Sequence, residues 1–191
     1  EMKPTSIARL LAVFLLFSGS LSQAASLYSE KDLEIARRAM ATAQASDEVL
    51  RQALRKRLRA ALQLGVTTCE VKTGYGLYPD AELRLLRIVQ QAQQDGDVVV
   101  APTFLCHVPP PELGSADSAE RQRFIRSLCA AVPQAQALGA SSIDVYCDAG
   151  AFTRDEATQI LQAGQRSGLQ LRCHAEQFTY TGIAEEAARL G

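Results

Sequence analysis

The sequence predicts an α/β fold: part of a (β/α) barrel of the TIM type, with about four strand-then-helix units. Apolar, β-branched runs alternate along the chain with segments of helical periodicity, which is typical of a parallel sheet with outer helices. A doubly wound sheet is the alternative. It is disfavoured because no G-x-G-x-x-G follows any predicted strand, and Gly74-Tyr75-Gly76 has only half of that pattern.

The first unit is preceded by a helix that Ser46 or Asp47 can cap and that Gly65 ends. Residues 65–73 are rich in β-branched side chains and predict a strand, which a glycine-rich turn follows. An amphipathic pattern then predicts a helix over residues 80–95.

The second unit has a predicted strand over residues 97–106 and a helix from about Ser118. Pro133 falls inside that helical region. Because proline lacks an N–H and favours the first turn of a helix, we expect it to begin a second, short helix.

Two further units follow. Residues 142–147 predict the third strand, and a capping box at Thr153 and Glu156 opens the next helix, which ends near Gly168. Residues 169–175 predict the fourth strand, and residues 182–190 predict a final helix.

Residues 1–38 differ from the rest. Lys3 and Arg9 precede an apolar run, residues 10–17, and small and polar residues follow it, as in a secretory signal. A buried helix or a scar of a truncated gene is the alternative, and Glu1 before Met2 favours an unnatural start. We expect an irregular or helical extension over residues 1–38 and the barrel domain over residues 39–191.

Composition excludes several classes of partner. The net charge of −1 and the spread of basic residues among leucines over residues 51–59 indicate a solvated helix face, so we expect no nucleic-acid partner. The apolar run is too short for a comfortable membrane span. The five cysteines are odd in number and widely spaced, which predicts no disulfide framework. Four of the five lie in apolar, strand-like runs that predict free, buried thiols in a reducing compartment.

The chain has two histidines, His107 and His174, and each ends a predicted strand. The carboxyl ends of barrel strands carry active sites, so this placement favours function over a structural hydrogen bond. A Cys₂His₂ zinc site with Cys106 and Cys173 is disfavoured, because neighbouring residues of a strand point to opposite faces.

Five motifs, in order, resemble the imidazolonepropionase family. Residues 65–77 are similar to the family's GVTTVEVKSGYGL, and residues 103–112 to its FLGAHAVPPE. The other three matches are residues 143–152 with DVFCEEGAF, residues 171–178 with VHADQF, and residues 43–50 with ATRAASEDEL.

The resemblance implies a metal-dependent amidohydrolase with an eight-unit barrel, which opens the ring of 4-imidazolone-5-propanoate with water to give N-formimino-L-glutamate in histidine catabolism. It implies that His174 is a metal ligand and that Tyr75, His107 and Gln177 bind substrate. It also implies one divalent metal ion, zinc or iron, a small-molecule substrate, a cytoplasmic location and a possible homo-oligomer. A turn aromatic is the structural alternative for Tyr75.

These residue types suit that chemistry. A ring amide is a poor electrophile, and a metal supplies hydroxide near neutral pH. Gln177 can donate to a ring carbonyl and accept from a ring N–H, and His107 can stabilise a developing oxyanion. We expect Glu176 to fix His174 or a helix cap, and Asp148 to support the site without binding metal.

The family's His-x-His pair is absent, and its late aspartate and histidine have no counterpart. We therefore expect a truncated fragment that is inactive and marginally stable alone, with no catalytic residue assigned. Another cyclic-amide amidohydrolase, or a non-catalytic, exported half-barrel that serves as an interaction module, are the alternatives.

Overall fold

The computed structural model describes residues 30–191 except 95, 97 and 114. The chain divides into two compact units, Glu1–Ala45 and Ser46–Gly191. The described part of the first unit contains helix α3 (Glu30–Gln44), which agrees with the helical form expected for the N-terminal extension. The signal-like run of residues 10–17 lies outside the described residues.

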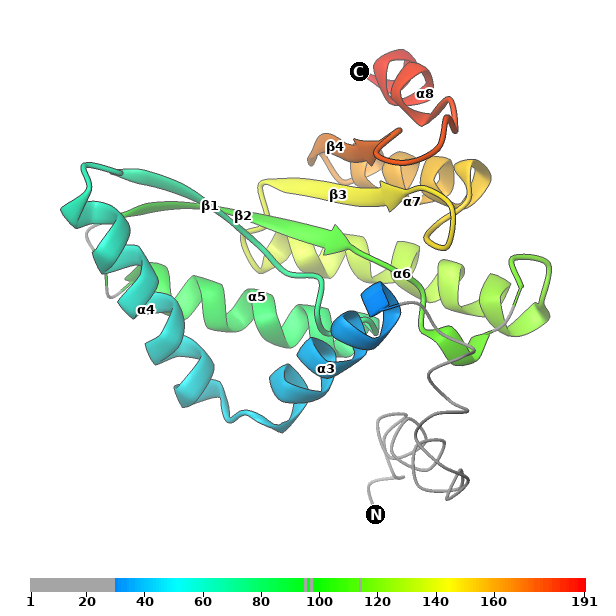
Figure 1. The fold of residues 1–191 in the computed structure, drawn as a ribbon. Helices are drawn as coiled ribbons and strands as arrows, with labels where there is room; N and C mark the ends of the chain where they lie inside the picture. The colour runs from blue at the N-terminus through cyan, green and yellow to red at the C-terminus, as the bar shows by residue number, and fades with distance from the viewer. Residues whose placement is uncertain (1–29, 95, 97, 114) are drawn as a thin grey trace, which may run out of the picture. The chain divides into compact units, whose positions relative to one another are not determined.

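The second unit alternates strands and helices, as Figure 1 shows. None of the helices in the described part of the chain is long and apolar enough to cross a membrane. The elements are α4 (Asp47–Gln63), β1 (Thr68–Lys72), α5 (Pro79–Gln94), β2 (Val99–Cys106), the 3-10 helix η1 (Pro111–Leu113), α6 (Ala119–Ala137), β3 (Ser142–Cys147), α7 (Arg154–Arg166), β4 (Gln170–Ala175) and α8 (Ile183–Leu190).

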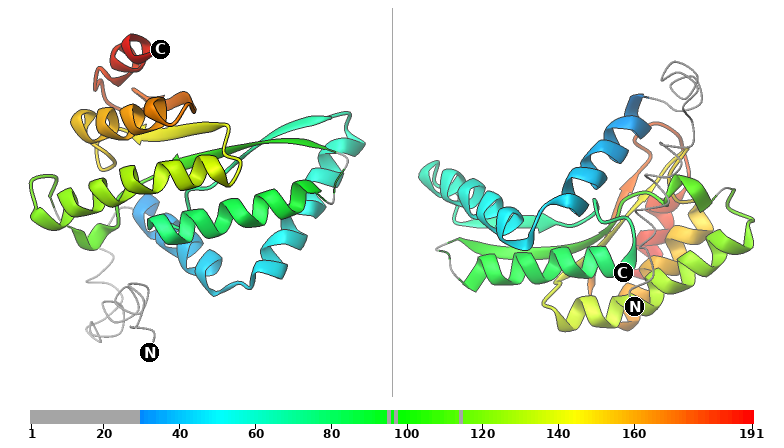
Figure 2. Two further views of the ribbon diagram at one scale, coloured as in Figure 1. Left: turned by 180° about the vertical axis from the view of Figure 1, so that it is seen from behind. Right: turned by 90° about the horizontal axis from the view of Figure 1, so that it is seen from below.

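The four strands form one parallel sheet in the order β1-β2-β3-β4 (Figure 2). Each strand pairs with the next one in sequence, so the order contains no reversal of the kind that defines a doubly wound sheet. Successive right-handed units that advance in one direction build a barrel wall. The predicted partial (β/α) barrel is therefore confirmed.

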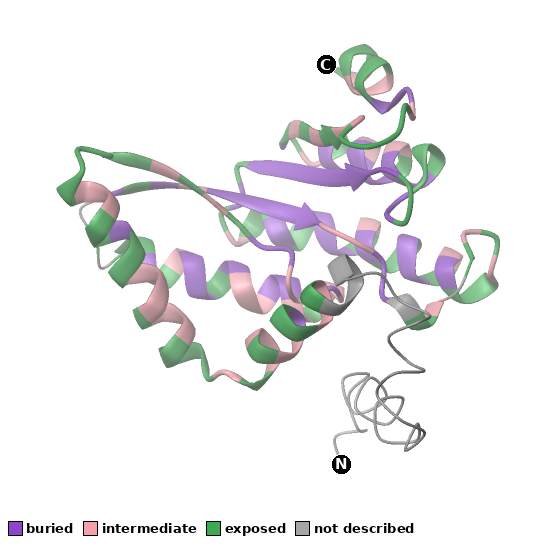
Figure 3. Cartoon of the chain, in the orientation of Figure 1, coloured by how far each residue is buried: buried purple, intermediate pink, exposed green. Residues whose placement is uncertain are grey.

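The core lies between the sheet and helices α5, α6 and α7. Along β2 and β3, Phe104, Cys106, Ile143, Val145 and Cys147 join this apolar cluster and are buried. Their neighbours in sequence point to the opposite face because side chains alternate along a strand. Both strands are buried along most of their length (Figure 3). One face of the sheet thus packs against the helices, and the other face can carry polar groups.

The helix starts follow from their capping residues. Ser46 and Ser118 accept hydrogen bonds from the N–H groups of Val49 and Arg121. Thr153 and Glu156 form the predicted capping box, each side chain accepting from the other's backbone N–H. All three predicted helix starts are confirmed.

Pro133 does not begin a second helix, and that prediction was wrong. Helix α6 runs without interruption from Ala119 to Ala137 with Pro133 inside it. The proline is on the exposed side of the helix, whereas Val132 and Ala135 are fully buried in the core. Packing of that buried face outweighs the one backbone hydrogen bond that the proline removes.

All five cysteines are free thiols, as predicted. Cys106 and Cys147 are buried, and Cys173 packs against the helix-side core. Burial raises the pKa of the Cys106 thiol well above its ordinary value, which keeps it protonated and unreactive.

Glu82, in the first turn of α5, makes stability depend on pH. Burial raises its pKa from 4.5 to about 7, although hydrogen bonds from Gly74, Thr73, Leu77 and Gly76 act in the opposite direction. Between pH 4.5 and 7 the folded state therefore binds more protons than the unfolded state, so stability falls as pH rises.

We expect Glu82 to lower the free energy of unfolding by an amount on the order of 3 kcal/mol between pH 4.5 and pH 7. Urea denaturation of the chain and of Glu82→Gln at a series of pH values measures the difference between their pH profiles. Parallel profiles for the two proteins would contradict the assignment.

Candidate functional site

Four rings, one from each strand or the turn after it, form a row at the carboxyl edge of the sheet. The centroids of Tyr75 and His107 are 5.4 Å apart in an edge-on contact. The His107 centroid is 6.0 Å from that of Tyr146, and the Tyr146 centroid is 6.0 Å from that of His174. The structure therefore brings three of the four predicted site residues into one row, with a tyrosine ring between the two histidines.

Tyr146 was missed by the sequence analysis. It belongs to β3, is 4% exposed and pairs in register with His174 on β4. The run Ser142-Ile-Asp-Val-Tyr-Cys147 alternates polar and apolar side chains, which placed Asp144 and Tyr146 on the same face. Both residues lie within β3, and a search for site residues at the strand ends alone does not include them.

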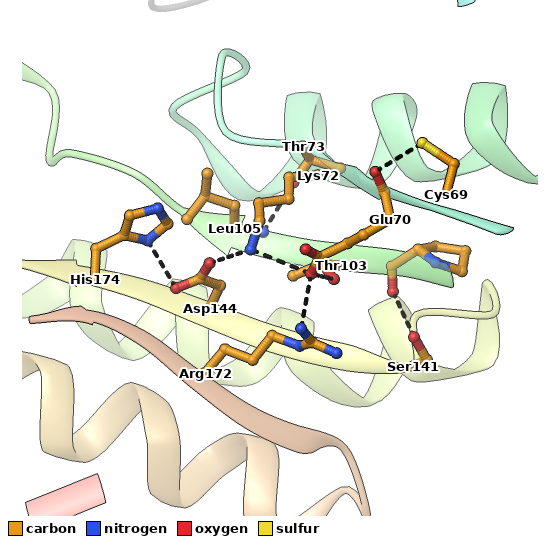
Figure 4. Close-up of polar contacts among 11 residues, drawn as sticks. Cys69, Glu70, Lys72, Thr73, Thr103, Leu105, Ser141, Asp144, Arg172 and His174 are labelled. Carbon is orange, nitrogen blue, oxygen red and sulfur yellow. Dashed lines mark hydrogen bonds and ion pairs between the residues drawn. The ribbon is translucent and has the colours of Figure 1, made fainter. Parts of the chain in front are cut away.

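The same face carries a line of charges, drawn in Figure 4. Lys72 Nζ of β1 donates to Asp144 Oδ2 of β3 at 2.6 Å. Asp144 Oδ1 lies 3.0 Å from Nδ1 of His174 on β4. The Asp144 side chain is 2% exposed, so this carboxylate joins a cation on one side to an imidazole on the other, away from water.

Glu70 and Thr103 extend this line toward the amino ends of the strands. Glu70 accepts from the Thr103 hydroxyl at 2.6 Å and pairs with Lys72 at 3.1 Å and Arg172 at 3.4 Å. Partial burial opposes ionisation of Glu70, but these donors and cations lower its pKa below the ordinary value. Partial burial likewise opposes the charge on Lys72, but Asp144 and Glu70 raise its pKa. Both groups stay charged at neutral pH.

The contact between His174 Nδ1 and Asp144 favours one neutral tautomer of the ring. The carboxylate also accepts from Lys72, so the tautomer that carries its proton on Nδ1 and donates to Asp144 fits this contact. In the neutral ring Nε2 then keeps its lone pair, the arrangement that prepares a histidine for a metal or a substrate N–H. The His174 side chain is 43% exposed, so its imidazole ring is accessible from solvent.

A complete metal centre is not formed by these residues. Within residues 30–191, apart from 95, 97 and 114, no group of three or more His, Cys, Asp or Glu side chains could hold a metal ion. A catalytic zinc takes three protein ligands or more, and His174 supplies one imidazole nitrogen. The ring of Tyr146 also separates the two histidines. The donor set of the described chain does not fit a metal by itself.

Gln177, the fourth predicted residue, is exposed and lies in the loop after β4, outside the row of rings. Asp148, at the end of β3, holds this loop. Its carboxylate accepts from the backbone N–H groups of Phe178 at 2.8 Å and Thr179 at 3.1 Å, as well as from the Thr179 hydroxyl. The Thr179 hydroxyl, aided by these N–H groups, lowers the pKa of Asp148. Asp148 thus supports the loop that carries Gln177.

Glu176 fixes a helix cap, one of the two roles expected for it. Its Oε1 accepts from the N–H of Ile183 and the hydroxyl of Thr181, both at 3.1 Å. This bond replaces a capping side chain at Gly182, which has none. The carboxylate of Asp144, rather than that of Glu176, contacts His174.

Sequence comparison agrees with the motif resemblance. The chain is 46% identical over 155 residues to an imidazolonepropionase of Anaeromyxobacter dehalogenans, covering 79% of this chain and 36% of that protein. It is 40% identical over 144 residues to that of Pyrobaculum arsenaticum, covering 75% of this chain and 33% of that protein. The imidazolonepropionase of Deinococcus deserti is 40% identical over 153 residues. No protein-family model matches the chain.

The chain is a relative of the imidazolonepropionases. It spans about a third of the length of the curated relatives that it matches. The resemblance inferred from the five motifs is confirmed.

Asp144→Asn tests the line of charges. The amide keeps the shape but removes the charge that pairs with Lys72, so we expect a loss of stability of about 2 kcal/mol. Urea denaturation measures the loss, with Glu120→Gln as the control, because Glu120 makes an exposed pair with Arg123. An Asp144→Asn protein as stable as the control variant would contradict a structural role for the carboxylate.

Proposed function

We propose that this chain forms the substrate-pocket side of an imidazolonepropionase-type hydrolase. In that reaction water adds to the carbonyl of 4-imidazolone-5-propanoate, the ring C–N amide bond breaks, and N-formimino-L-glutamate forms with the proton passing to the released nitrogen. The observation that carries the proposal is the row Tyr75–His107–Tyr146–His174 in a chain 40–46% identical to imidazolonepropionases.

Three residues are proposed to bind the substrate. Tyr75 and His107 are in edge-on contact, so their rings present a wall with polar atoms at its rim to a flat, five-membered ring. His107 can donate to the carbonyl oxygen as negative charge develops on it. Gln177, on the loop that Asp148 holds, can donate to a carbonyl and accept from a ring N–H.

His174 is proposed to offer Nε2 as one ligand of a divalent metal, zinc or iron. Imidazole suits either ion, and the contact of Nδ1 with Asp144 orients the ring for this task. When bound, such a metal lowers the pKa of a water molecule. The remaining ligands have no counterpart in the described residues, so the role of His174 is limited here to orientation and donation of one nitrogen.

Binding of the substrate by the chain tests this proposal without requiring turnover. We expect freshly prepared 4-imidazolone-5-propanoate to cause saturable NMR shifts of the His107 and His174 ring resonances. His107→Ala removes a hydrogen bond and should raise Kd about tenfold, whereas Glu120→Gln, on the exposed face of α6, should leave it unchanged.

A chain that shows no saturable shift would contradict the proposal. Hydantoin-5-propanoate, which carries a carbonyl where the imidazolone has a C–H, separates the substrate classes. Tighter binding of the hydantoin than of the imidazolone would overturn the assignment in favour of another cyclic amide.

A further inference from the structure

The turn that carries Tyr75, residues 73–77, follows a backbone path that needs support. Gly74 has φ 121° and Leu77 has φ 63°, both in the left-handed region, where a leucine is strained. A Cβ on Gly76 would lie 2.7 Å from backbone atoms of Ala81 and Glu82, so the turn is pressed against the first turn of α5. This backbone conformation of residues 73–77 therefore needs an attractive interaction that stabilises it.

The carboxylate of Glu82 supplies that interaction. Oε2 accepts from the N–H of Gly74 at 2.6 Å, and Oε1 accepts from the N–H groups of Gly76 and Leu77, both at 2.7 Å. Three backbone donors therefore converge on one side chain that is 2% exposed. Hydrogen bonds to a charged, buried acceptor are stronger than those between neutral groups.

The far side of the same turn contacts the row of rings. A Cβ on Gly74 would lie 2.7 Å from Leu105 Cδ2 and 3.3 Å from the Cβ of His107. The next residue is Tyr75, whose ring meets His107 edge-on. The turn is thus held between Glu82 on one side and the end of β2 on the other, and a shift of its backbone moves Tyr75 relative to His107.

Burial of this carboxylate is not explained by stability. The donors to Glu82 are neutral, namely three backbone N–H groups and the Thr73 side chain, and a buried charge that only dipoles stabilise is costly. Glu156, which is also buried, has a cation, Arg121, at 2.7 Å. The difference indicates that the role of Glu82 lies in the shape of the turn.

We propose that Glu82 is a positioning residue for the substrate pocket, whose carboxylate fixes the turn of residues 73–77 so that Tyr75 stands against His107. The importance of that pair rests on the proposed function, whereas the positioning itself does not. Glu82 touches neither ring and acts only through the backbone that carries Tyr75.

Glu82→Gln in the full chain is the direct test. The glutamine amide cannot accept from all three N–H groups, and its own NH₂ opposes at least one of them. Asp80→Asn is the matched control because it neutralises an exposed carboxylate in the same first turn of α5. The NMR cross-peaks between the Tyr75 and His107 rings, recorded at pH 8, report the contact.

We expect loss of these cross-peaks in Glu82→Gln and their retention in Asp80→Asn, with the strand resonances unchanged in both. Hydrogen exchange at Gly74, Gly76 and Leu77 should accelerate about tenfold to a hundredfold in Glu82→Gln. A folded Glu82→Gln that keeps the cross-peaks overturns the proposal.

A variant that fails to fold leaves a measurement on the natural chain. At pH 8 the amides of Gly74, Gly76 and Leu77 should exchange as slowly as those of β2, and rates as fast as in the exposed turn at Gly150 overturn the proposal. None of these readouts uses imidazolone propanoate. Failure of ligand binding would therefore count against the proposed function and leave the positioning result standing.

Discussion

The alternation of side chains along four parallel strands is the constraint on which the rest of this structure depends. It sends Phe104, Ile143 and Val145 into the helix-side core, and it sends Lys72 and Asp144 to the opposite face. A slip of one residue in any strand would bury charge among apolar helices. The register that builds the core is therefore the register that assembles the polar site.

Elements with strong local signals could be predicted from the sequence. The caps Ser46, Ser118 and Thr153 each satisfy a backbone N–H locally, so neighbours in sequence suffice to identify them. Pro133 was misjudged because its effect depends on tertiary packing: the burial of Val132 and Ala135 holds α6 together across the proline. The strength of that packing cannot be seen in a helical pattern.

The candidate site could be predicted at the strand ends but not within the strands. Tyr75, His107 and His174 stand beside turns, where parallel strands are known to place active residues. Asp144 depends on partners 72 residues before it and 30 after it, and Glu82 depends on the path of a turn, neither of which follows from composition. The roles of both carboxylates follow from contacts that form only when the strands and the turn are in place.

Strand register places Nδ1 of His174 against Asp144, and we infer that this leaves Nε2 for a ligand. The ¹⁵N chemical shifts of the neutral His174 ring, recorded in the natural chain and in Asp144→Asn, test this arrangement most directly. We expect the Nδ1–H tautomer in the natural chain and a mixture of tautomers in Asp144→Asn. A predominant Nε2–H tautomer in the natural chain would contradict the account.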